Sequence, residues 1–229
     1  MRLKISLARE PKHKDLVSAV AWSTSDEVLS CADDHVLMRW NLVSGENSVI
    51  ANLPLGKLYA TNLSDSLYPT DIHWYPRSLV GGPKKGGAST DLFILASTDG
   101  KFYLISKSGR VEKAVDAHKG AVLSVRWSYD GSSLLSVGED GAVKVWSRSG
   151  MLRSTLSQNS SPVYAGSWSP DNNQILYCNG KQLTIKPLQA NAKPTQWKAH
   201  DDVVLSLDWN PCNNLIVSGG EDCRYKVTF

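Results

Sequence analysis

Histidine, serine and aspartate, the residue types of a hydrolase triad, recur along this chain of 229 residues at a fixed spacing. The two sets that share one spacing are His118, Ser136, Asp140 and His200, Ser218, Asp222. A serine that is activated by a histidine, itself oriented by an aspartate, can carry out acyl transfer. An enzyme needs such a triad only once, however, and the sequence has no Gly-x-Ser-x-Gly nucleophile motif. We therefore expect no catalytic residue and interpret the set as part of a repeated scaffold.

The tryptophans give the period of that scaffold. Five of them are each followed within three residues by turn-forming residues: Trp22, Trp74, Trp127, Trp168 and Trp209. Their intervals are 52, 53, 41 and 41 residues. The polar stretch 55–67 accounts for the surplus in the first interval, and 12 extra residues between Trp74 and Asp99, including the glycine-rich segment 81–87, account for the second. A 41-residue period is typical of one propeller blade.

The segment around Trp127 shows what one period contains. Residues 122–127, 133–137 and 142–146 are β-branched, aromatic or alternating, and turn residues separate them. Residues 151–156 supply a fourth such segment after a Ser-Gly turn. No segment of the chain keeps a helical apolar period without a Gly, Pro or Asn breaking it. The sequence therefore predicts an all-β protein built from four-stranded antiparallel blades.

The first repeat carries the same polar set, with 21 rather than 22 residues between its histidine and its aspartate. A tryptophan follows the aspartate by six residues in the first and third repeats. This pattern resembles WD repeats. In that family the four side chains form a hydrogen-bonded chain that satisfies buried polar groups and fixes a turn. The resemblance implies such structural networks for His13, Ser30, Asp34 and Trp40, for His118, Ser136, Asp140 and Trp146, and for His200, Ser218 and Asp222.

Two repeats depart from this pattern. The second has no histidine before its first strand, and Ile105 stands where the tryptophan is due after Asp99. The fourth also lacks the histidine, and Gly180 falls near the aspartate position. We expect these two blades to depend on apolar packing alone and to open more readily than the others.

The repeats predict a single WD40-type β-propeller region over residues 1–229. The expected parts are a closing strand at 1–7, blades at 8–55, 68–114, 115–157 and 158–195, and a partial fifth blade at 196–229. WD propellers usually close with about seven blades, or roughly 290 residues at this period. We therefore expect an incomplete propeller of about four and a half four-stranded blades. Two arrangements fit this length. In one, the chain is a fragment or truncated form and its blades make an open arc. In the other, residues 2–7 add a strand to the fifth blade and give a non-standard closure.

Composition excludes several classes of function. The 25 Lys and Arg are interspersed with 22 Asp and Glu, without an aromatic and basic stripe, so we expect no nucleic-acid partner. No apolar run approaches ~20 residues, so we expect no membrane insertion. The four cysteines form no Cys-x-x-Cys pair, which favours reduced thiols in a cytosolic protein over a metal site. We expect no cofactor.

A narrower resemblance is carried by residues 97–102, 104–113, 150–156, 180–188 and 220–227, together with the opening 1–7. These runs are similar to the N-terminal propeller of the eighty-kilodalton WD-repeat subunits of intraflagellar transport complex B. The resemblance implies a non-catalytic scaffold for assembly and transport in cilia and flagella. It also implies location in the cytoplasm, the cilium and the ciliary base, with other complex B subunits or ciliary cargo as partners. Residues 55–67, 81–87 and 228–229 depart from that family.

Contact residues are less well specified. Loops into the first strand of a blade are common binding positions, which makes candidates of Lys14, Asp15, Lys119, Asp201 and Asp202. Lys84 and Lys85 in the glycine-rich insertion are further candidates. Solvated loop charge is the competing interpretation for each of them. Two other classes of function are alternatives. One is a WD adaptor or substrate receptor in ubiquitin transfer or RNA processing, and the other is a basic nucleic-acid binder, which the interspersed charges disfavour.

Overall fold

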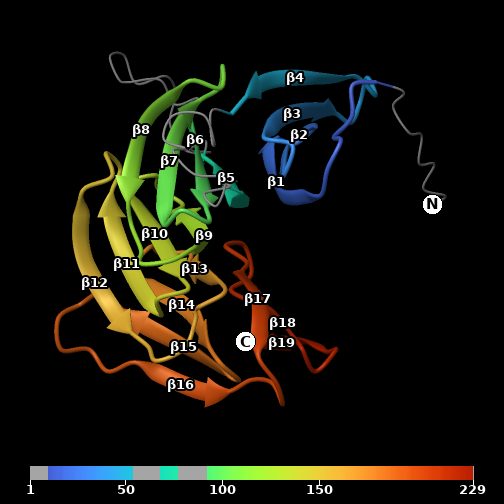
Figure 1. Ribbon diagram of the computed structural model, residues 1–229. Coiled ribbons are helices and arrows are strands. Elements are labelled where there is room, and N and C mark those ends of the chain that lie inside the picture. Colours follow the sequence, from blue (N-terminus) through green and yellow to red (C-terminus); the bar gives the residue numbers. More distant parts are fainter. Residues whose placement is uncertain (1–9, 54–67, 77–91, 229) are drawn as a thin grey trace.

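The computed structural model describes residues 10–53, 68–76 and 92–228, and all regular secondary structure in these ranges is β-strand. Nineteen strands form five antiparallel sheets, which we call blades 1 to 5 in chain order (Figure 1). Blade 1 contains β1 (Val17–Thr24), β2 (Glu27–Ala32), β3 (Val36–Asn41) and β4 (Asn47–Asn52). Blade 2 contains β5 (Pro69–Trp74), β6 (Leu92–Ser97), β7 (Lys101–Ser106) and β8 (Val111–Asp116). The prediction of an all-β protein made of antiparallel blades is confirmed.

The remaining blades follow the same plan. Blade 3 contains β9 (Val122–Trp127), β10 (Ser133–Gly138), β11 (Ala142–Ser147) and β12 (Leu152–Gln158). Blade 4 contains β13 (Gly166–Trp168), β14 (Gln174–Asn179), β15 (Gln182–Pro187) and β16 (Thr195–Lys198). Blade 5 contains β17 (Val204–Trp209), β18 (Ile216–Gly220) and β19 (Tyr225–Thr228). Four blades thus have four strands, and the fifth has three within the described residues.

The hairpin between the second and third strands has a turn that its sequence explains. In blade 3 this turn ends at Gly141, whose φ of +75° lies in the left-handed region that glycine adopts without a steric penalty. The backbone N–H of Gly141 donates to the carbonyl of Gly138 over 3.1 Å and closes the turn. The turn aligns Ser136 with Lys144 and Leu134 with Trp146 across the two strands.

Apolar side chains fill the seams between adjacent blades. One buried cluster joins blades 1 and 2, with Leu29 and Leu37 against Trp74 and Phe93. A second joins blades 2 and 3, and a third extends through blades 3, 4 and 5. The hydrophobic core of the molecule is therefore a series of interfaces between sheets, as alternation on both faces of each blade predicts.

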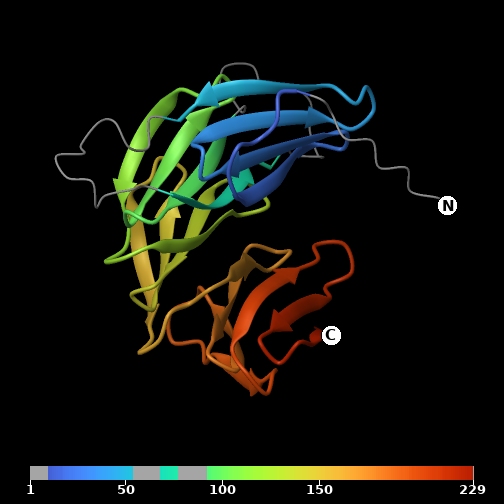
Figure 2. The same ribbon diagram turned by 45° about the vertical axis from the view of Figure 1, so that its right-hand side comes forward.

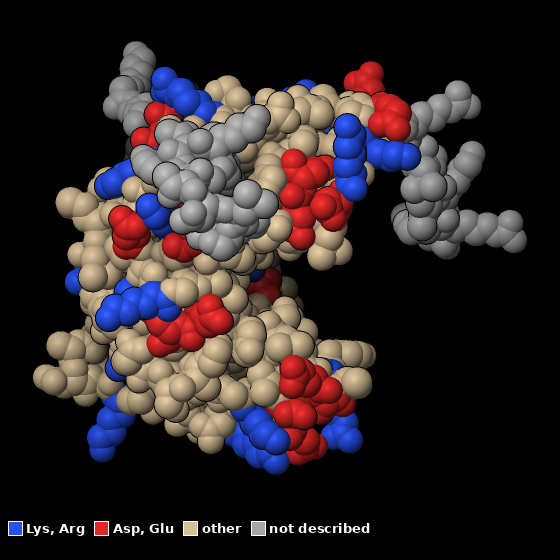
Figure 3. Space-filling view, in the orientation of Figure 1, with Lys and Arg blue, Asp and Glu red and all other residues tan. Residues whose placement is uncertain are grey.

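The five blades follow one another around an arc, and the first strand of each lies on its inner side (Figures 1 and 2). Blade 1 and blade 5 lie on the two sides of an opening, where the space-filling view is hollowed (Figure 3). Large apolar side chains are exposed on both end blades: Trp22 is 60% exposed and Tyr225 is 80% exposed. The end blades thus carry apolar surface of the kind that the inner seams bury.

Three expected blade boundaries need correction. The last strands of blades 2, 3 and 4 end at Asp116, Gln158 and Lys198, beyond the expected limits of 114, 157 and 195. The reason is pairing with the preceding strand, which continues to the turn, as in Lys101 with Asp116 and Gln182 with Lys198. The expected closing strand at 1–7 and the insertions at 55–67 and 81–87 lie outside the described residues.

Candidate functional site

The polar residues of the third repeat form a continuous hydrogen-bonded chain in blade 3. The indole Nε1–H of Trp146 donates to Ser136 Oγ over 2.8 Å. Ser136 Oγ lies 2.7 Å from Nε2 of His118, and Nδ1 of His118 lies 2.8 Å from Asp140. One arrangement of protons satisfies every group: the serine donates to Nε2, and Nδ1–H donates to the carboxylate. The chain therefore links the third strand, the second strand and the loop before the first strand.

Blades 1 and 5 repeat this geometry. In blade 1, His13 Nε2 lies 2.7 Å from Ser30 Oγ and His13 Nδ1 lies 3.1 Å from Asp34. Trp40 Nε1 donates to the same serine over 2.7 Å. The corresponding distances in blade 5, among His200, Ser218 and Asp222, are both 2.9 Å. The structure brings together all eleven residues that the WD resemblance implies, as three separate networks in three different blades.

The aspartate of each network also binds backbone. Asp140 accepts hydrogen bonds from the N–H groups of Lys119 and Ala142, each over 3.0 Å. Burial acts to raise the pKa of Asp140, but these hydrogen bonds and the one from His118 outweigh it and hold that pKa below its ordinary value. Burial lowers the pKa of His118, against the opposing effect of Asp140. The pair is therefore an ionised carboxylate and a neutral imidazole.

The burial of these networks decides what they can do. The side chain of His118 is fully buried, and Ser136 is 1% exposed. A nucleophilic serine must reach a substrate, and this hydroxyl already binds two neighbouring side chains inside the blade. The geometry therefore fits a network that satisfies buried polar groups and fixes the turn.

Blades 2 and 4 contain polar networks of a different kind, so the expectation that they depend on apolar packing alone is wrong. In blade 2, the hydroxyl of Tyr103 donates to Asp99 over 2.6 Å, and the same carboxylate accepts the backbone N–H of Lys101. In blade 4, the amide of Asn179 donates to Asn159 over 3.0 Å. A tyrosine four residues after the aspartate is the sequence signal that could have indicated the first of these networks.

Sequence reasoning also missed a set of polar contacts between blades 2 and 3. Asp71 on β5 accepts the backbone N–H of Val125 over 2.9 Å and forms an ion pair with Arg126 on β9. His73 Nδ1 accepts the backbone N–H of Trp127 over 3.0 Å. Burial, with a smaller effect from Arg126, lowers the pKa of His73 to about 3, so this imidazole is neutral. These contacts tie two first strands together along the inner side of the arc.

The first strands also line an axial cavity of about 470 Å³. The residue that precedes the tryptophan of each repeat contributes to its wall: Ala21, His73, Arg126, Ser167 and Asp208. Ser167 Oγ donates to Asp208 over 3.2 Å across the seam between blades 4 and 5. Much of the polar wall is therefore engaged in contacts between blades.

The candidate contact residues lie on exposed turns, and several have structural roles. The backbone N–H groups of Lys14, Lys119 and Asp201 donate to the network aspartates of their own blades over 2.8, 3.0 and 3.0 Å. Asp15 and Asp202 accept the N–H of the next residue in their loops. These five residues belong to blades 1, 3 and 5 and do not form a single cluster. Lys84 and Lys85 lie outside the described residues.

The described residues show no metal site and no membrane-spanning helix. Cys31 and Cys178 are buried, and Cys212 and Cys223 are exposed. Within residues 10–53, 68–76 and 92–228, no three His, Cys, Asp or Glu side chains group as a metal site would require. The same ranges hold no helix that is long and apolar enough to cross a bilayer.

Comparison with known proteins identifies the repeats and close relatives. The family model described as "WD domain, G-beta repeat" matches residues 6–41, 109–147 and 192–227, the repeats of His13, His118 and His200. The intraflagellar transport protein 80 homologs of Mus musculus and Rattus norvegicus are each 57% identical to this chain over 227 residues. That alignment covers 99% of this chain and 28% of each relative. The F-box-like/WD repeat-containing protein TBL1Y of Homo sapiens is 30% identical over 95 residues, 41% of this chain and 18% of that protein.

Proposed function

We propose that this chain, which carries WD repeats and is similar along nearly its whole length to the intraflagellar transport protein 80 homologs, is a propeller part of a subunit of intraflagellar transport complex B. In this role it is a non-catalytic protein-interaction scaffold for the assembly and transport of cilia and flagella. Its partners are other complex B subunits or ciliary cargo. Its locations are the cytoplasm, the ciliary base and the cilium or flagellum.

The observation that carries this proposal is 57% identity over 99% of the chain. That alignment includes the second and fourth repeats, which the general WD model does not match. WD elements alone are common to many adaptors, whereas similarity that includes irregular repeats is more specific. The buried, mutually satisfied Ser and His side chains support the non-catalytic part of the proposal.

We propose further that the described blades form one propeller region whose arc is open in the isolated chain. The support is the exposed apolar surface on blades 1 and 5, where inner seams bury equivalent faces. Exposed sheet faces and edges favour association. Light scattering of the purified chain should therefore show self-association that increases with concentration. A monomer at every concentration would contradict an open arc.

Affinity capture from ciliated cells tests the main proposal. The tagged chain should enrich other complex B subunits over an untagged control, and less strongly than a tagged full-length relative does. Because this chain spans little more than a quarter of its relatives' length, we expect it to keep only some of their contacts. Capture without any complex B subunit would refute the proposal, and capture equal to that of the full-length relative would refute the reduced set of contacts.

An adaptor or substrate receptor in ubiquitin transfer or RNA processing is the second candidate. The observation in its favour is the similarity of 95 residues to a protein named as F-box-like. The same capture experiment separates the two candidates, because ubiquitin-transfer or RNA-processing proteins would then replace complex B subunits among the bound proteins.

A further inference from the structure

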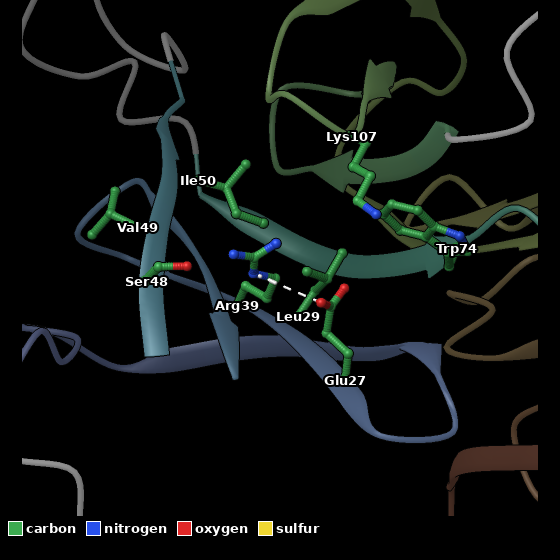
Figure 4. Close-up of a pocket in the computed structure, with 8 residues that line it drawn as sticks. All are labelled: Glu27, Leu29, Arg39, Ser48, Val49, Ile50, Trp74 and Lys107. Carbon is green, nitrogen blue, oxygen red and sulfur yellow. Dashed lines mark ion pairs between the residues drawn. The ribbon is translucent and has the colours of Figure 1, made fainter. Parts of the chain in front are cut away.

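A small pocket opens at the seam between blades 1 and 2, at the opposite end of the strands from the turn that holds Asp34. Its volume is about 190 Å³. Leu29, Ile50 and Trp74 supply apolar lining, and Glu27, Arg39, Ser48, Val49 and Lys107 complete it. Arg39 projects from β3 between Glu27 and Ile50, and Lys107 extends from the turn after β7 on the side of the pocket where Trp74 lies (Figure 4). Two cations from different blades thus line one pocket together with apolar side chains.

The repeats show that Arg39 occupies a position which the other blades fill with an aliphatic side chain. Arg39 pairs with Leu29 on β2 and with Ser48 on β4. At the same register position of blade 3, Val145 on the third strand pairs with Leu135 and Ser154. The third-strand residue at this position is Leu104 in blade 2 and Ile185 in blade 4.

The exposure of the side chain at this position also differs between blade 1 and blades 2 and 3. Leu104 is 6% exposed and Val145 is 4% exposed, and both belong to the apolar clusters against the next blade. The side chain of Arg39 is 44% exposed. An arginine here gives up the apolar packing that seals the other seams, and it leaves the pocket in its place.

Lys107 also lacks the partner that its counterpart has. Lys107 and Arg148 occupy the same position in two similar turns, each flanked by serines whose hydroxyls lie 3.0 Å apart. The guanidinium of Arg148 stacks on Tyr75, the residue after the tryptophan of the preceding blade, at 4.7 Å from the ring centroid. The residue after Trp22 is Ser23, which donates to Glu27 over 2.6 Å. Within the described residues, Lys107 therefore has no ring from blade 1 at the position where Tyr75 covers Arg148.

Within the described residues, the pocket has more positive charge than its own acid neutralises. Glu27 contacts the guanidinium of Arg39 only through Nε, at 3.7 Å. No described side chain pairs with the terminal nitrogens of Arg39 or with Lys107 Nζ. Arg39 and Lys107 against Glu27 leave one net positive charge. The planar end of an arginine matches a carboxylate in two-point geometry.

We propose that this pocket binds an acidic side chain from an extended segment of a partner protein. The carboxylate lies between Arg39 and Lys107, and the methylene groups of the acidic residue and an adjacent aliphatic side chain pack on Leu29, Ile50 and Trp74. The pocket would supply one contact of the scaffold proposed above. Peptide binding by the purified chain tests this pocket, and capture of complex B subunits from cells tests the proposed function. Either measurement can fail without the other.

The experiment is a titration of three synthetic peptides into the isotope-labelled chain, followed by amide and indole NMR signals. The peptides are acetyl-Ala-Leu-Glu-Leu-Ala-amide, its glutamine analogue and its phosphoserine analogue. The glutamate peptide should shift the signals of Trp74 and β3, and added salt should weaken its binding. The glutamine peptide should bind about tenfold more weakly, which corresponds to ~1.4 kcal/mol.

Variants of the chain test the two cations. Arg39→Leu restores the aliphatic residue of the other blades, so it should fold and bind the glutamate peptide about tenfold more weakly. Lys107→Gln changes an exposed turn residue, so it should not disturb the core, and it should also weaken binding of the glutamate peptide. Lys193→Gln, which removes one exposed positive charge from blade 4, is the matched control and should bind as the unaltered chain does.

Three results would overturn the proposal. The first is equal affinity for the glutamate and glutamine peptides. The second is unchanged binding by both Arg39→Leu and Lys107→Gln. The third is binding of the phosphoserine peptide without the glutamate peptide, which would assign the pocket to phosphate instead of carboxylate.

Discussion

Replacing Ser136 by alanine tests the polar network of blade 3 most directly. Its hydroxyl links the Trp146 indole to the His118 imidazole, with distances of 2.8 and 2.7 Å. Alanine removes this oxygen and leaves an indole N–H and an imidazole nitrogen without a partner. The site is 1% exposed, so water does not replace the lost hydroxyl without rearrangement.

The expected cost follows from those two groups. A buried donor or acceptor left unsatisfied costs ~1–3 kcal/mol. Two such groups, partly relieved by local adjustment, should lower the free energy of unfolding by about 3 kcal/mol. With a urea dependence of about 3 kcal/mol per molar, the unfolding midpoint should decrease by about 1 M.

Urea unfolding followed by tryptophan fluorescence measures this change, and amide exchange locates it in blade 3. Ser160→Ala is the matched control, because Ser160 is exposed and lies on the loop that follows the same blade. The control should change stability by no more than about 0.5 kcal/mol. A Ser136→Ala midpoint equal to that of the control would refute the role assigned to the network.

Three further predictions test other parts of the molecule. The hydrogen bonds to Asp222 outweigh burial and lower the pKa of this carboxyl to about 2. The ionised carboxyl therefore contributes stability above pH ~4, and this contribution should be lost as the pH falls towards 2. An Asp222→Asn variant with the same acid unfolding curve would contradict this. Gly141→Ala should lower the free energy of unfolding by ~2 kcal/mol more than Gly180→Ala does. Both positions have a positive φ, but only the methyl group added at 141 meets a backbone carbonyl. Equal unfolding midpoints of the two variants would contradict this. Asp71→Asn should lower stability by ~2 kcal/mol and increase amide exchange at Val125, whereas exchange confined to β5 would show that the contact does not couple the two blades.

The local structure of the blades could be predicted from sequence because every determinant lies within one repeat. The strand expected at 122–127 is observed as Val122–Trp127, and the turn at Gly141 falls between the segments expected at 133–137 and 142–146. His118, Ser136 and Asp140 are separated by at most 22 residues, so the WD pattern contains the complete network. Boundaries were less accurate because the ends of the last strands depend on pairing with a neighbour.

Contacts between blades could not be predicted in the same way. Asp71 and Val125 are 54 residues apart, and their hydrogen bond depends on the angle and separation of two sheets. Nothing in the alternation of β5 distinguishes an aspartate that faces solvent from one that meets the next blade. The contact between the Tyr103 hydroxyl and Asp99 in blade 2 was missed for a different reason, because the WD pattern places a histidine beside this aspartate and includes no tyrosine.

The repeats themselves supply the comparison that a single blade cannot. Cross-strand register places Arg39, Leu104, Val145 and Ile185 at the same position of four sheets, so the protein contains its own controls for what that position needs. Three aliphatic residues show that packing at a seam is satisfied without charge. A charged residue at the seam between blades 1 and 2 therefore calls for an explanation other than folding, and the terminal nitrogens of Arg39, with which no described side chain pairs, supply one together with Lys107. The same logic applies to Arg148, which stacks on Tyr75 and closes its seam, and it separates residues that complete a blade from residues that remain available to a partner.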